Sequence, residues 1–198
     1  MKKGQTRALE RPRAKRRSTR YALEAGPTGA SWPERLHAVL RECGVRQVAY
    51  VPDSGHARLI ELAHADPQLR AVALTTEEEG VALAVGAWLG GDRSVLLTQS
   101  SGVGNCINML SLISACRFPF LTFITMRGEW AEFNPWQVPM SQATEPVLIA
   151  MGVKVYRVTD ADEVAETAQA AADLAFGGDL AVAVLLSQKM IGRKVWVK

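Results

Sequence analysis

Short apolar segments alternate with stretches of helical apolar spacing along the chain, and together they predict six strands and six helices. The predicted strands are buried runs that span residues 45–51, 70–76, 94–99, 120–125, 154–158 and 180–186. The predicted helices lie between residues 31 and 44, 57 and 65, 77 and 89, 105 and 115, 143 and 151, and 160 and 176. This alternation indicates a single three-layer, doubly wound α/β domain, whose mainly parallel sheet is covered on both faces.

Two of the predicted helices begin with the residues of a capping box. Ser31 and Glu34 flank the first turn of one helix, and Asp160 and Glu163 flank the first turn of the other. Gly44 is expected to end the first helix, because glycine readily adopts the conformation of a C-terminal cap.

Loops that follow parallel strands are expected to meet at one edge of the sheet, because right-handed crossovers place every strand-to-helix connection there. These loops carry polar residues that a core does not require, and they span residues 52–56, 75–78, 99–104 and 126–142. Open α/β sheets bind their ligands at this edge. The loops therefore form the candidate site.

The loop 99–104 contains two glycines, Gly102 and Gly104, which allow another group to approach the backbone closely. It is not a dinucleotide-binding fingerprint, because Ile107 stands where the third glycine is required, and it lacks the Gly-Lys-Ser/Thr of a Walker loop. Spacing alone leaves open whether this tight turn contacts a ligand.

Three consecutive glutamates, residues 77–79, open the next candidate segment. Acidic side chains favour the first turn of a helix through the helix dipole, which is enough to explain most such clusters. The helix that they open is rich in small residues, however, and such a helix packs tightly against another helix or a ligand. The small residues are Gly80, Ala82, Ala84, Gly86 and Ala87.

Length and composition indicate one domain with a full core, since the chain has 198 residues and 48% apolar content. No apolar run approaches the length of a membrane span. Cys43, Cys106 and Cys116 show no CxxC spacing, so we expect reduced, buried thiols in a cytoplasmic protein rather than metal ligands. The three histidines form no cluster either, and no metal site is expected within this chain.

Charge is distributed unevenly along the chain. Residues 1–20 hold nine Lys/Arg and one Glu, whereas the remainder has 14 Lys/Arg against 19 Asp/Glu. We expect residues 1–30 to be a disordered basic tail, residues 31–188 to be the folded domain, and residues 189–198 to be a basic C-terminal segment. A basic tail is able to bind nucleic acid or an anionic surface, but a plain solvated extension explains it with fewer assumptions, and neither nucleic acid nor a membrane is the expected partner.

Five motifs appear in a particular order and spacing. They are Val51-Pro-Asp-Ser54, Glu77-x-x-Gly-Val-Ala-Leu-Ala-Val-Gly86-Ala-Trp, Gln99-Ser-Ser-Gly-Val-Gly-Asn-Cys-Ile-Asn108, Arg127-Gly-Glu129 and Gln137-Val-Pro-Met140. Together they resemble the pyrimidine-binding (Pyr) domain of thiamine-diphosphate-dependent enzymes, and more closely the sulfopyruvate and phosphonopyruvate decarboxylase group. The resemblance covers residues 32–188.

The resemblance implies a catalytic role for one glutamate. In the family, a glutamate at the start of this helix hydrogen-bonds N1′ of the cofactor pyrimidine. That bond favours the imino tautomer, which removes the thiazolium C2 proton before the cofactor adds to a 2-oxo acid and CO2 leaves. Counting back nine residues from Gly86, as the family pattern requires, selects Glu77. Glu78 is the alternative if the helix start shifts by one residue.

The resemblance also implies other site residues. Ser54 matches a position whose side chain faces the substrate, so it is a candidate for catalysis and, with Asp53, for substrate binding; a turn or helix cap explains both equally well. Neighbouring His56 could assist proton transfer, although a histidine beside a turn is more often a cap or surface residue. The residues matched to the loop near the cofactor are Gln99, Ser101, Gly102, Val103 and Gly104.

Arg127 is a candidate clamp for a second anionic group on the substrate, since its planar guanidinium suits a carboxylate, sulfonate or phosphonate. An ion pair with Glu129 or Glu132 explains it equally well. The loop that follows contains Trp130, Phe133 and Trp136. These aromatic residues indicate either a bulkier substrate or anchors of an interface.

The family requires a second domain, which binds the diphosphate through Mg2+ and carries a Gly-Asp-Gly triplet and paired asparagines. This chain has Gly-Gly-Asp at 90–92 and 177–179 but neither of those motifs, and it ends where such a domain would begin. The resemblance therefore implies an α (Pyr) subunit. Thiamine diphosphate and Mg2+ would be held mainly by a separate β subunit, in a hetero-oligomer such as α2β2 or larger, with the small-residue helix at the interface.

The expected function is thus that of an α subunit of a 2-oxo acid decarboxylase, with sulfopyruvate or phosphonopyruvate as the favoured substrate. Two alternatives stay open. One is a carboligase or lyase of the same cofactor class with another 2-oxo acid specificity. The other is a non-catalytic binding module that has kept the fold, because a fold does not determine a function.

Overall fold

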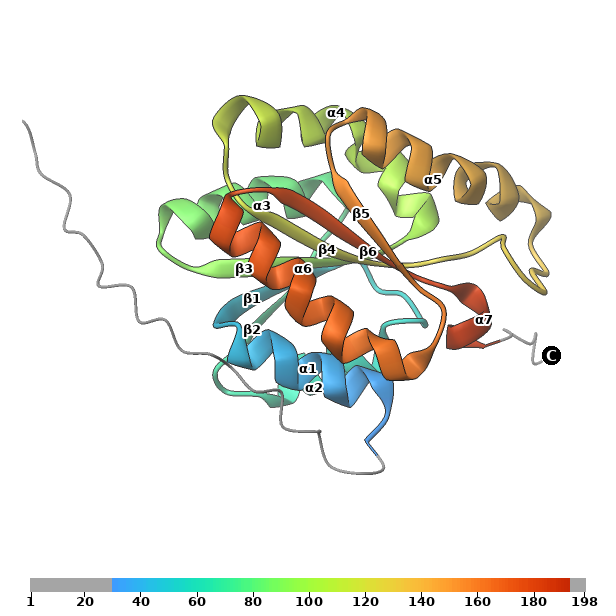
Figure 1. Cartoon of the computed structure of the whole chain (residues 1–198), viewed down its shortest axis with the longest axis horizontal. Coiled ribbons are helices and arrows are strands. Elements are labelled where there is room, and N and C mark those ends of the chain that lie inside the picture. Colours follow the sequence, from blue (N-terminus) through green and yellow to red (C-terminus); the bar gives the residue numbers. More distant parts are fainter. Residues whose placement is uncertain (1–29, 193–198) are drawn as a thin grey trace, which may run out of the picture.

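Six parallel strands form the centre of the computed structural model, which describes residues 30–192 (Figure 1). Their order across the sheet is β2-β1-β3-β4-β6-β5, and every neighbouring pair is parallel. The predicted fold class and all six predicted strands are confirmed. The strands are β1 (Val45–Tyr50), β2 (Arg70–Ala73), β3 (Arg93–Gln99), β4 (Phe120–Thr125), β5 (Lys154–Val158) and β6 (Ala181–Leu186).

Helices cover both faces of the sheet, so the domain has three layers (Figure 1). One face is covered by α1 (Trp32–Glu42), α2 (Ala57–Ala65) and α6 (Val164–Gly178), which share one hydrophobic core. The other face is covered by α3 (Glu78–Leu89), α4 (Ser100–Cys116) and α5 (Val138–Ala150), which share a second core.

Burial of the strands follows their place in the sheet. Every residue of β4 and β6 is buried, because both faces of these central strands are covered. The edge strands β2 and β5 keep exposed positions. This is why the central strands were recognisable in the sequence as continuous apolar runs.

The strand order reverses at β1, which pairs with β2 on one side and with β3 on the other. After β2 the chain must therefore cross back over the sheet, and α3 makes this crossover on the opposite face from α1 and α2. A crevice forms outside the carboxyl ends of the strands at such a topological switch point. Glu77, which immediately precedes α3, is thus placed where open α/β sheets bind ligands.

Two helices begin several residues before their predicted starts. The segment expected as a glycine loop is helical from Ser100 onward, with Gln99 as the N-terminal cap of α4. The helix predicted from residue 143 begins at Val138, after a 3-10 turn over Pro135–Gln137. Pro139 in its first turn favours this early start. Proline has the φ angle of a helix, and the backbone N–H that it lacks has no partner in the first turn of a helix.

The first predicted capping box forms, whereas the second forms only in part, because Asp160 accepts from Asp162 and not from Glu163. The backbone amide of Ser31 donates to Oε2 of Glu34 at 2.8 Å, and Gly44 has a positive φ of 74° after α1. The carboxylate of Asp160 accepts from the amide of Asp162 at 2.9 Å, although the first turn there is the 3-10 helix Ala161–Glu163 and α6 begins only at Val164.

Three further expectations concern burial and the chain ends. Cys43 and Cys106 are buried as predicted, but Cys116 is exposed at the end of α4. Within residues 30–192, no helix is long and apolar enough to cross a membrane. The basic tail predicted for residues 1–30 lies outside the described residues except for its last position, and so do residues 193–198 of the C-terminal segment. Residues 189–192 of the C-terminal segment are described. They include most of α7 (Gln188–Ile191), a helix that was not predicted.

Candidate active site

Glu77 is the buried carboxylate at the switch point of the sheet. It lies at the N-terminal cap of α3, and its residue is only 7% exposed. Oε2 of Glu77 accepts a hydrogen bond from Nδ2 of Asn105, on α4, at 2.7 Å. Buried carboxylates are retained where they have such partners. Burial, followed by the charges of Glu77 and Glu78, raises the pKa of the neighbouring Cys106 thiol to about 12, which keeps that thiol neutral.

Gly102 makes room for this carboxylate. A Cβ at Gly102 would lie 2.3 Å from Oε1 of Glu77 and 2.3 Å from Oγ1 of Thr98, far closer than nonbonded atoms approach. The backbone of Gly102 is helical as part of α4, so the conformational freedom of glycine is not what the position requires. It requires the absence of a side chain.

The three glutamates of the cluster have different surroundings. Glu79 is exposed, and its Oε2 accepts from the backbone amide of Thr75 at 2.8 Å, which is the contact of a helix cap. Glu78 is partly exposed. Only Glu77 is buried and faces α4. The helix-cap explanation for the cluster therefore applies to Glu79 and not to Glu77.

The other candidate cofactor residues lie at the end of β3 and in the first turns of α4. Gln99 is the last residue of β3, and its side-chain Oε1 is buried without a hydrogen-bond partner among the described residues. Ser101 and Gly104 are partly exposed, and a Cβ at Gly104 would lie 3.2 Å from Sδ of Met140. Val103, in contrast, is only 2% exposed and packs in the core beneath α4.

Asp53 links the turn after β1 to the end of β4. Its Oδ2 accepts from the amide of Gly55 at 3.1 Å and from Oγ1 of Thr125 at 2.6 Å. The bond from Gly55 is the contact of a turn, which is one of the two explanations that the sequence left open, and the bond from Thr125 ties that turn to β4. Ser54 is exposed on the same turn. Both candidates thus lie at the carboxyl edge of the sheet. Asp53 is hydrogen-bonded within the domain, whereas Ser54 faces outward.

His56 is the N-terminal cap residue of α2, as one expectation had it, but its side chain makes no cap hydrogen bond and lies in the core instead of at the surface. It is fully buried, and its Nε2 lies 3.1 Å from the carbonyl oxygens of both Thr98 and Phe123. Burial lowers the pKa of His56, with the nearby Asp53 opposing this effect. The neutral ring with a proton on Nε2 therefore holds β3 and β4 together at their carboxyl ends.

Arg127 is held in an ion pair with Glu132. Its Nε and Nη2 donate to the two carboxylate oxygens of Glu132 at 2.8 and 2.6 Å, and both side chains are buried. The hydrogen bonds from Arg127, together with those from nearby amides, lower the pKa of Glu132 to about 2. Of the two explanations for Arg127, the ion pair is the one that the geometry contains, although it is buried rather than at the surface.

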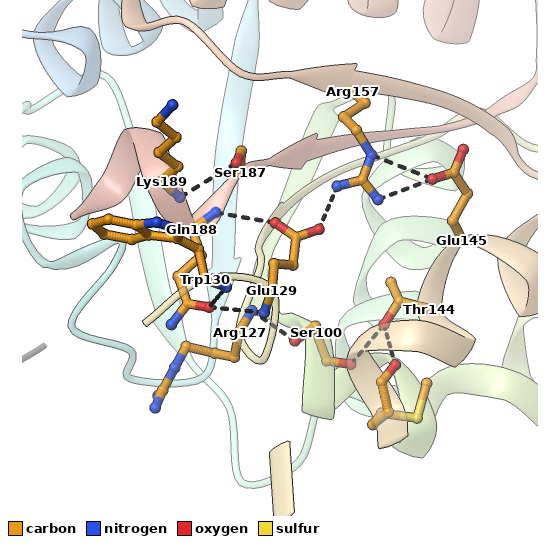
Figure 2. Close-up of polar contacts among 11 residues, drawn as sticks. Ser100, Arg127, Glu129, Trp130, Thr144, Glu145, Arg157, Ser187, Gln188 and Lys189 are labelled. Carbon is orange, nitrogen blue, oxygen red and sulfur yellow. Dashed lines mark hydrogen bonds and ion pairs between the residues drawn. The ribbon is translucent and has the colours of Figure 1, made fainter. Parts of the chain in front are cut away.

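Gln188 was not recognised in the sequence, yet it contacts Glu129 and Trp130 at the start of the aromatic loop, residues 127–142 (Figure 2). Its Oε1 accepts from the backbone amides of Glu129 and Trp130 at 2.9 and 3.0 Å, and its Nε2 donates to Oε2 of Glu132 at 2.9 Å. Gln188 is only 3% exposed. No local pattern marks such a residue, because its partners lie more than 50 positions away in the chain.

The same loop is tied to α5 and β5 through charged side chains. The guanidinium of Arg157 donates to Glu129 and, at 2.9 Å, to Glu145 (Figure 2). These residues line an open hollow of about 630 Å3, whose other walls are Gly128 and α5. None of the residues that line it belongs to α3 or to the first turn of α4. The hollow is thus a separate feature from the Glu77 site.

Among residues 30–192, no group of three or more His, Cys, Asp or Glu side chains is arranged to hold a metal ion. The carboxylates at this edge instead accept hydrogen bonds: Glu77 accepts from Asn105, and Asp53 accepts from Gly55 and Thr125.

Comparison with known proteins places this fold and site in a family. The alpha subunits of sulfopyruvate decarboxylase from Methanococcus maripaludis and Methanothermobacter thermautotrophicus are 31% and 33% identical to the chain. Each match covers 154 residues, which are 77% of this chain and 92% and 93% of the relatives. Phosphonopyruvate decarboxylase from Streptomyces viridochromogenes is 37% identical over 69% of this chain, which spans only 35% of that protein. No family model matches the chain.

Among solved structures, 2-oxoglutarate:ferredoxin oxidoreductase from Magnetococcus marinus superposes with a TM-score of 0.67 over 82% of this chain, at 15% sequence identity. This chain spans 29% of that protein, so the likeness concerns the fold of one part of it.

The fold, the site and the relatives define the class as Pyr domains of thiamine-diphosphate-dependent decarboxylases, as the motifs had implied. Within this class, the chain belongs to the family of sulfopyruvate decarboxylase alpha subunits.

Proposed function

We propose that this chain is the α (Pyr) subunit of a thiamine-diphosphate-dependent 2-oxo acid decarboxylase that acts on sulfopyruvate or phosphonopyruvate. The single observation that carries the proposal is the buried carboxylate of Glu77 at the topological switch point. It packs so closely against Gly102 that position 102 has no room for a side chain. A carboxylate in this position is the one group that the cofactor pyrimidine needs from a Pyr domain.

The residues present fit the pyrimidine end of thiamine diphosphate. Glu77 offers a buried carboxylate, and its Oε1 takes up the space that a side chain at Gly102 would fill. The buried Oε1 of Gln99, which has no partner among the described residues, is an acceptor available to an amino group. When bound, the cofactor supplies the electron sink on which a 2-oxo acid loses CO2.

This chain's contribution to the reaction is to bind and orient. Glu77 holds one ring nitrogen of the cofactor through a hydrogen bond in a water-poor site, where such a bond is stronger than in water. Gly102 sets how deeply the carboxylate sits, and His56 fixes the spacing of β3 and β4 beneath it. The exposed Ser54, on the turn after β1, is proposed to face the substrate.

The diphosphate and Mg2+ are proposed to be held by a separate β subunit, in a hetero-oligomer such as α2β2. Two relatives support this: they are called alpha subunits, and they are nearly the same length as the matched segment. The phosphonopyruvate decarboxylase that matches is nearly three times longer than its matched part, so a single polypeptide there carries more than this domain.

The substrate assignment rests on the relatives rather than on Arg127. To clamp a sulfonate or phosphonate through Nε and Nη2, Arg127 must first release Glu132, which accepts from both of these nitrogens and from Gln188. Breaking a buried pair of this kind is unfavourable. We therefore propose that Arg127 orders the loop around the substrate and does not bind the substrate directly.

The test begins with co-purification of this chain with a candidate β subunit that carries Gly-Asp-Gly and paired asparagines. CO2 release is then measured from sulfopyruvate, phosphonopyruvate and pyruvate, with and without thiamine diphosphate and Mg2+. The proposal expects cofactor-dependent release from sulfopyruvate or phosphonopyruvate and much slower release from pyruvate. Condensation products without the expected preference would favour a carboligase, and absence of binding to the cofactor would favour a non-catalytic module.

A further inference from the structure

Asn105 contacts the Glu77 carboxylate from a different helix. Its Nδ2 donates to Oε2 of Glu77 at 2.7 Å, and α3 and α4 lie side by side on the same face of the sheet (Figure 1). Asn105 is exposed, whereas Glu77 is buried. The amide therefore covers the carboxylate on its solvent side.

The two oxygens of Glu77 have different surroundings. Oε1 lies 2.3 Å from the position of a Cβ at Gly102, a residue that is buried in the domain. Oε2 points at the exposed Asn105. A ligand that arrives from outside this chain therefore meets Oε2, the oxygen that Asn105 already contacts.

We propose that Asn105 is a positioning residue, which fixes the orientation of the Glu77 carboxylate so that Oε2 is presented to the pyrimidine ring of thiamine diphosphate. This inference rests on the proposed function. A carboxylate oxygen has two lone-pair sites, so Oε2 keeps one site for the ring while it accepts from the amide. Because the side chain is ordered before the ring arrives, less conformational freedom is lost in the binding step.

Gly102 and Asn105 each restrict a different oxygen of the Glu77 carboxylate. Gly102 limits how Oε1 packs in the domain, and Asn105 limits where Oε2 points. Asn105 has no need to touch the cofactor for this role, so its effect on binding must act through Glu77. That dependence separates a positioning role from a general contribution to stability.

The test measures the Kd of thiamine diphosphate, with Mg2+, for the complex of this chain with its β subunit by titration calorimetry. Asn105→Ala is expected to weaken binding about tenfold, the value typical of a hydrogen bond to a charged group. The double variant Asn105→Ala with Glu77→Gln is expected to bind no more weakly than Glu77→Gln alone, because the amide acts through the carboxylate. Asn105→Asp, which has the same shape but no donor, should bind at least as weakly as Asn105→Ala.

Asn108→Ala is the matched control. Asn108 is also exposed and lies one turn further along α4, and its backbone oxygen, which accepts from Ser111, is unaffected by the substitution. This variant should bind thiamine diphosphate like the unmodified complex. Thermal unfolding of every variant verifies that the changes in Kd do not arise from loss of the fold.

The outcomes separate this inference from the function on which it rests. If the unmodified complex does not bind thiamine diphosphate, both are wrong. If it binds, and Glu77→Gln weakens binding, but Asn105→Ala changes Kd less than twofold or adds its full effect in the double variant, then only the role of Asn105 is wrong.

Discussion

Oε1 of Glu77 lies 2.3 Å from the position that a Cβ of Gly102 would occupy. The carboxylate of Glu77, at the N-terminal cap of α3, therefore packs directly against Gly102 on α4, and no larger residue fits at position 102. Gly102 thus belongs to the site through the side chain that it lacks.

Gly102→Ala is expected to displace the Glu77 carboxylate and to lower CO2 release by at least about a hundredfold, the usual effect of misplacing a group near the reacting atoms. Steady-state rates of the reconstituted complex, together with the Kd of thiamine diphosphate, measure this effect. Gly177→Ala is the control, because a Cβ at Gly177, near the end of α6, would have no atom within 4 Å. Equal activity of the two variants would contradict the account.

Gly86 tests whether the small-residue helix is an inter-subunit surface. A Cβ at Gly86 would have no atom within 4 Å in this chain, so Gly86→Ala is expected to stabilise the isolated chain by about 0.5–1 kcal/mol through helix propensity. Gly86→Leu should also fold, yet it should weaken association with the β subunit. Thermal unfolding and the Kd of the two subunits measure these effects. Unchanged association of Gly86→Leu would place the interface elsewhere.

Acid stability is expected to depend on the buried pair of Arg127 and Glu132. The pKa of Glu132 is about 2 in the folded chain and about 4.5 in the unfolded one, so its contribution to stability is present above pH 4.5 and is lost as pH falls toward 2. Glu132→Gln leaves Arg127 without its ionic partner and should destabilise the chain at pH 7 by about 3 kcal/mol.

The measurement is the free energy of unfolding from urea titrations at several pH values. Glu34 also has a pKa of about 2, because it accepts from Ser31 and Arg58, so the unmodified chain loses stability in the same window through both groups. The difference between the unmodified chain and Glu132→Gln isolates Glu132. That difference should shrink between pH 4.5 and 2, and a constant difference would show that Arg127 and Glu132 are not coupled.

Gln188 is expected to control the order of the aromatic loop. Gln188→Met has a similar shape but leaves the amides of Glu129 and Trp130 without their acceptor, which should lower the free energy of unfolding by about 2 kcal/mol. Hydrogen exchange at these two amides should accelerate more than exchange in β4. If both amides stay protected, another group supports the loop.

The strand pattern could be predicted well because its physical cause is local. Residues 120–125 and 154–158 were predicted at their observed limits, since both segments are rich in β-branched and aromatic residues, which favour strands. Glu77 could be selected by spacing and by resemblance. Its burial could not be predicted, because it depends on α4, which lies more than 20 residues away in the chain.

The missed features depend on packing between distant segments. Gly102 was interpreted as part of a tight turn that lets another group approach the backbone; the structure places it in a helix, and the group that needs the space is Glu77. For Arg127, the sequence offered two explanations of equal weight, and only the fold brings Gln188 and Glu132 together around it. No periodicity in the chain contains that information.

The central claim is that Glu77 is the carboxylate that works on the cofactor. The most direct test compares CO2 release by complexes that contain Glu77→Gln, Glu78→Gln and Glu79→Gln, each verified to assemble with the β subunit. Glu77→Gln should lower the rate by at least about a hundredfold, as for loss of a single electrostatic contact in an active site, whereas the other two should retain most of it. Near-full activity of Glu77→Gln, with loss of activity in Glu78→Gln, would contradict the account and move the catalytic role by one residue.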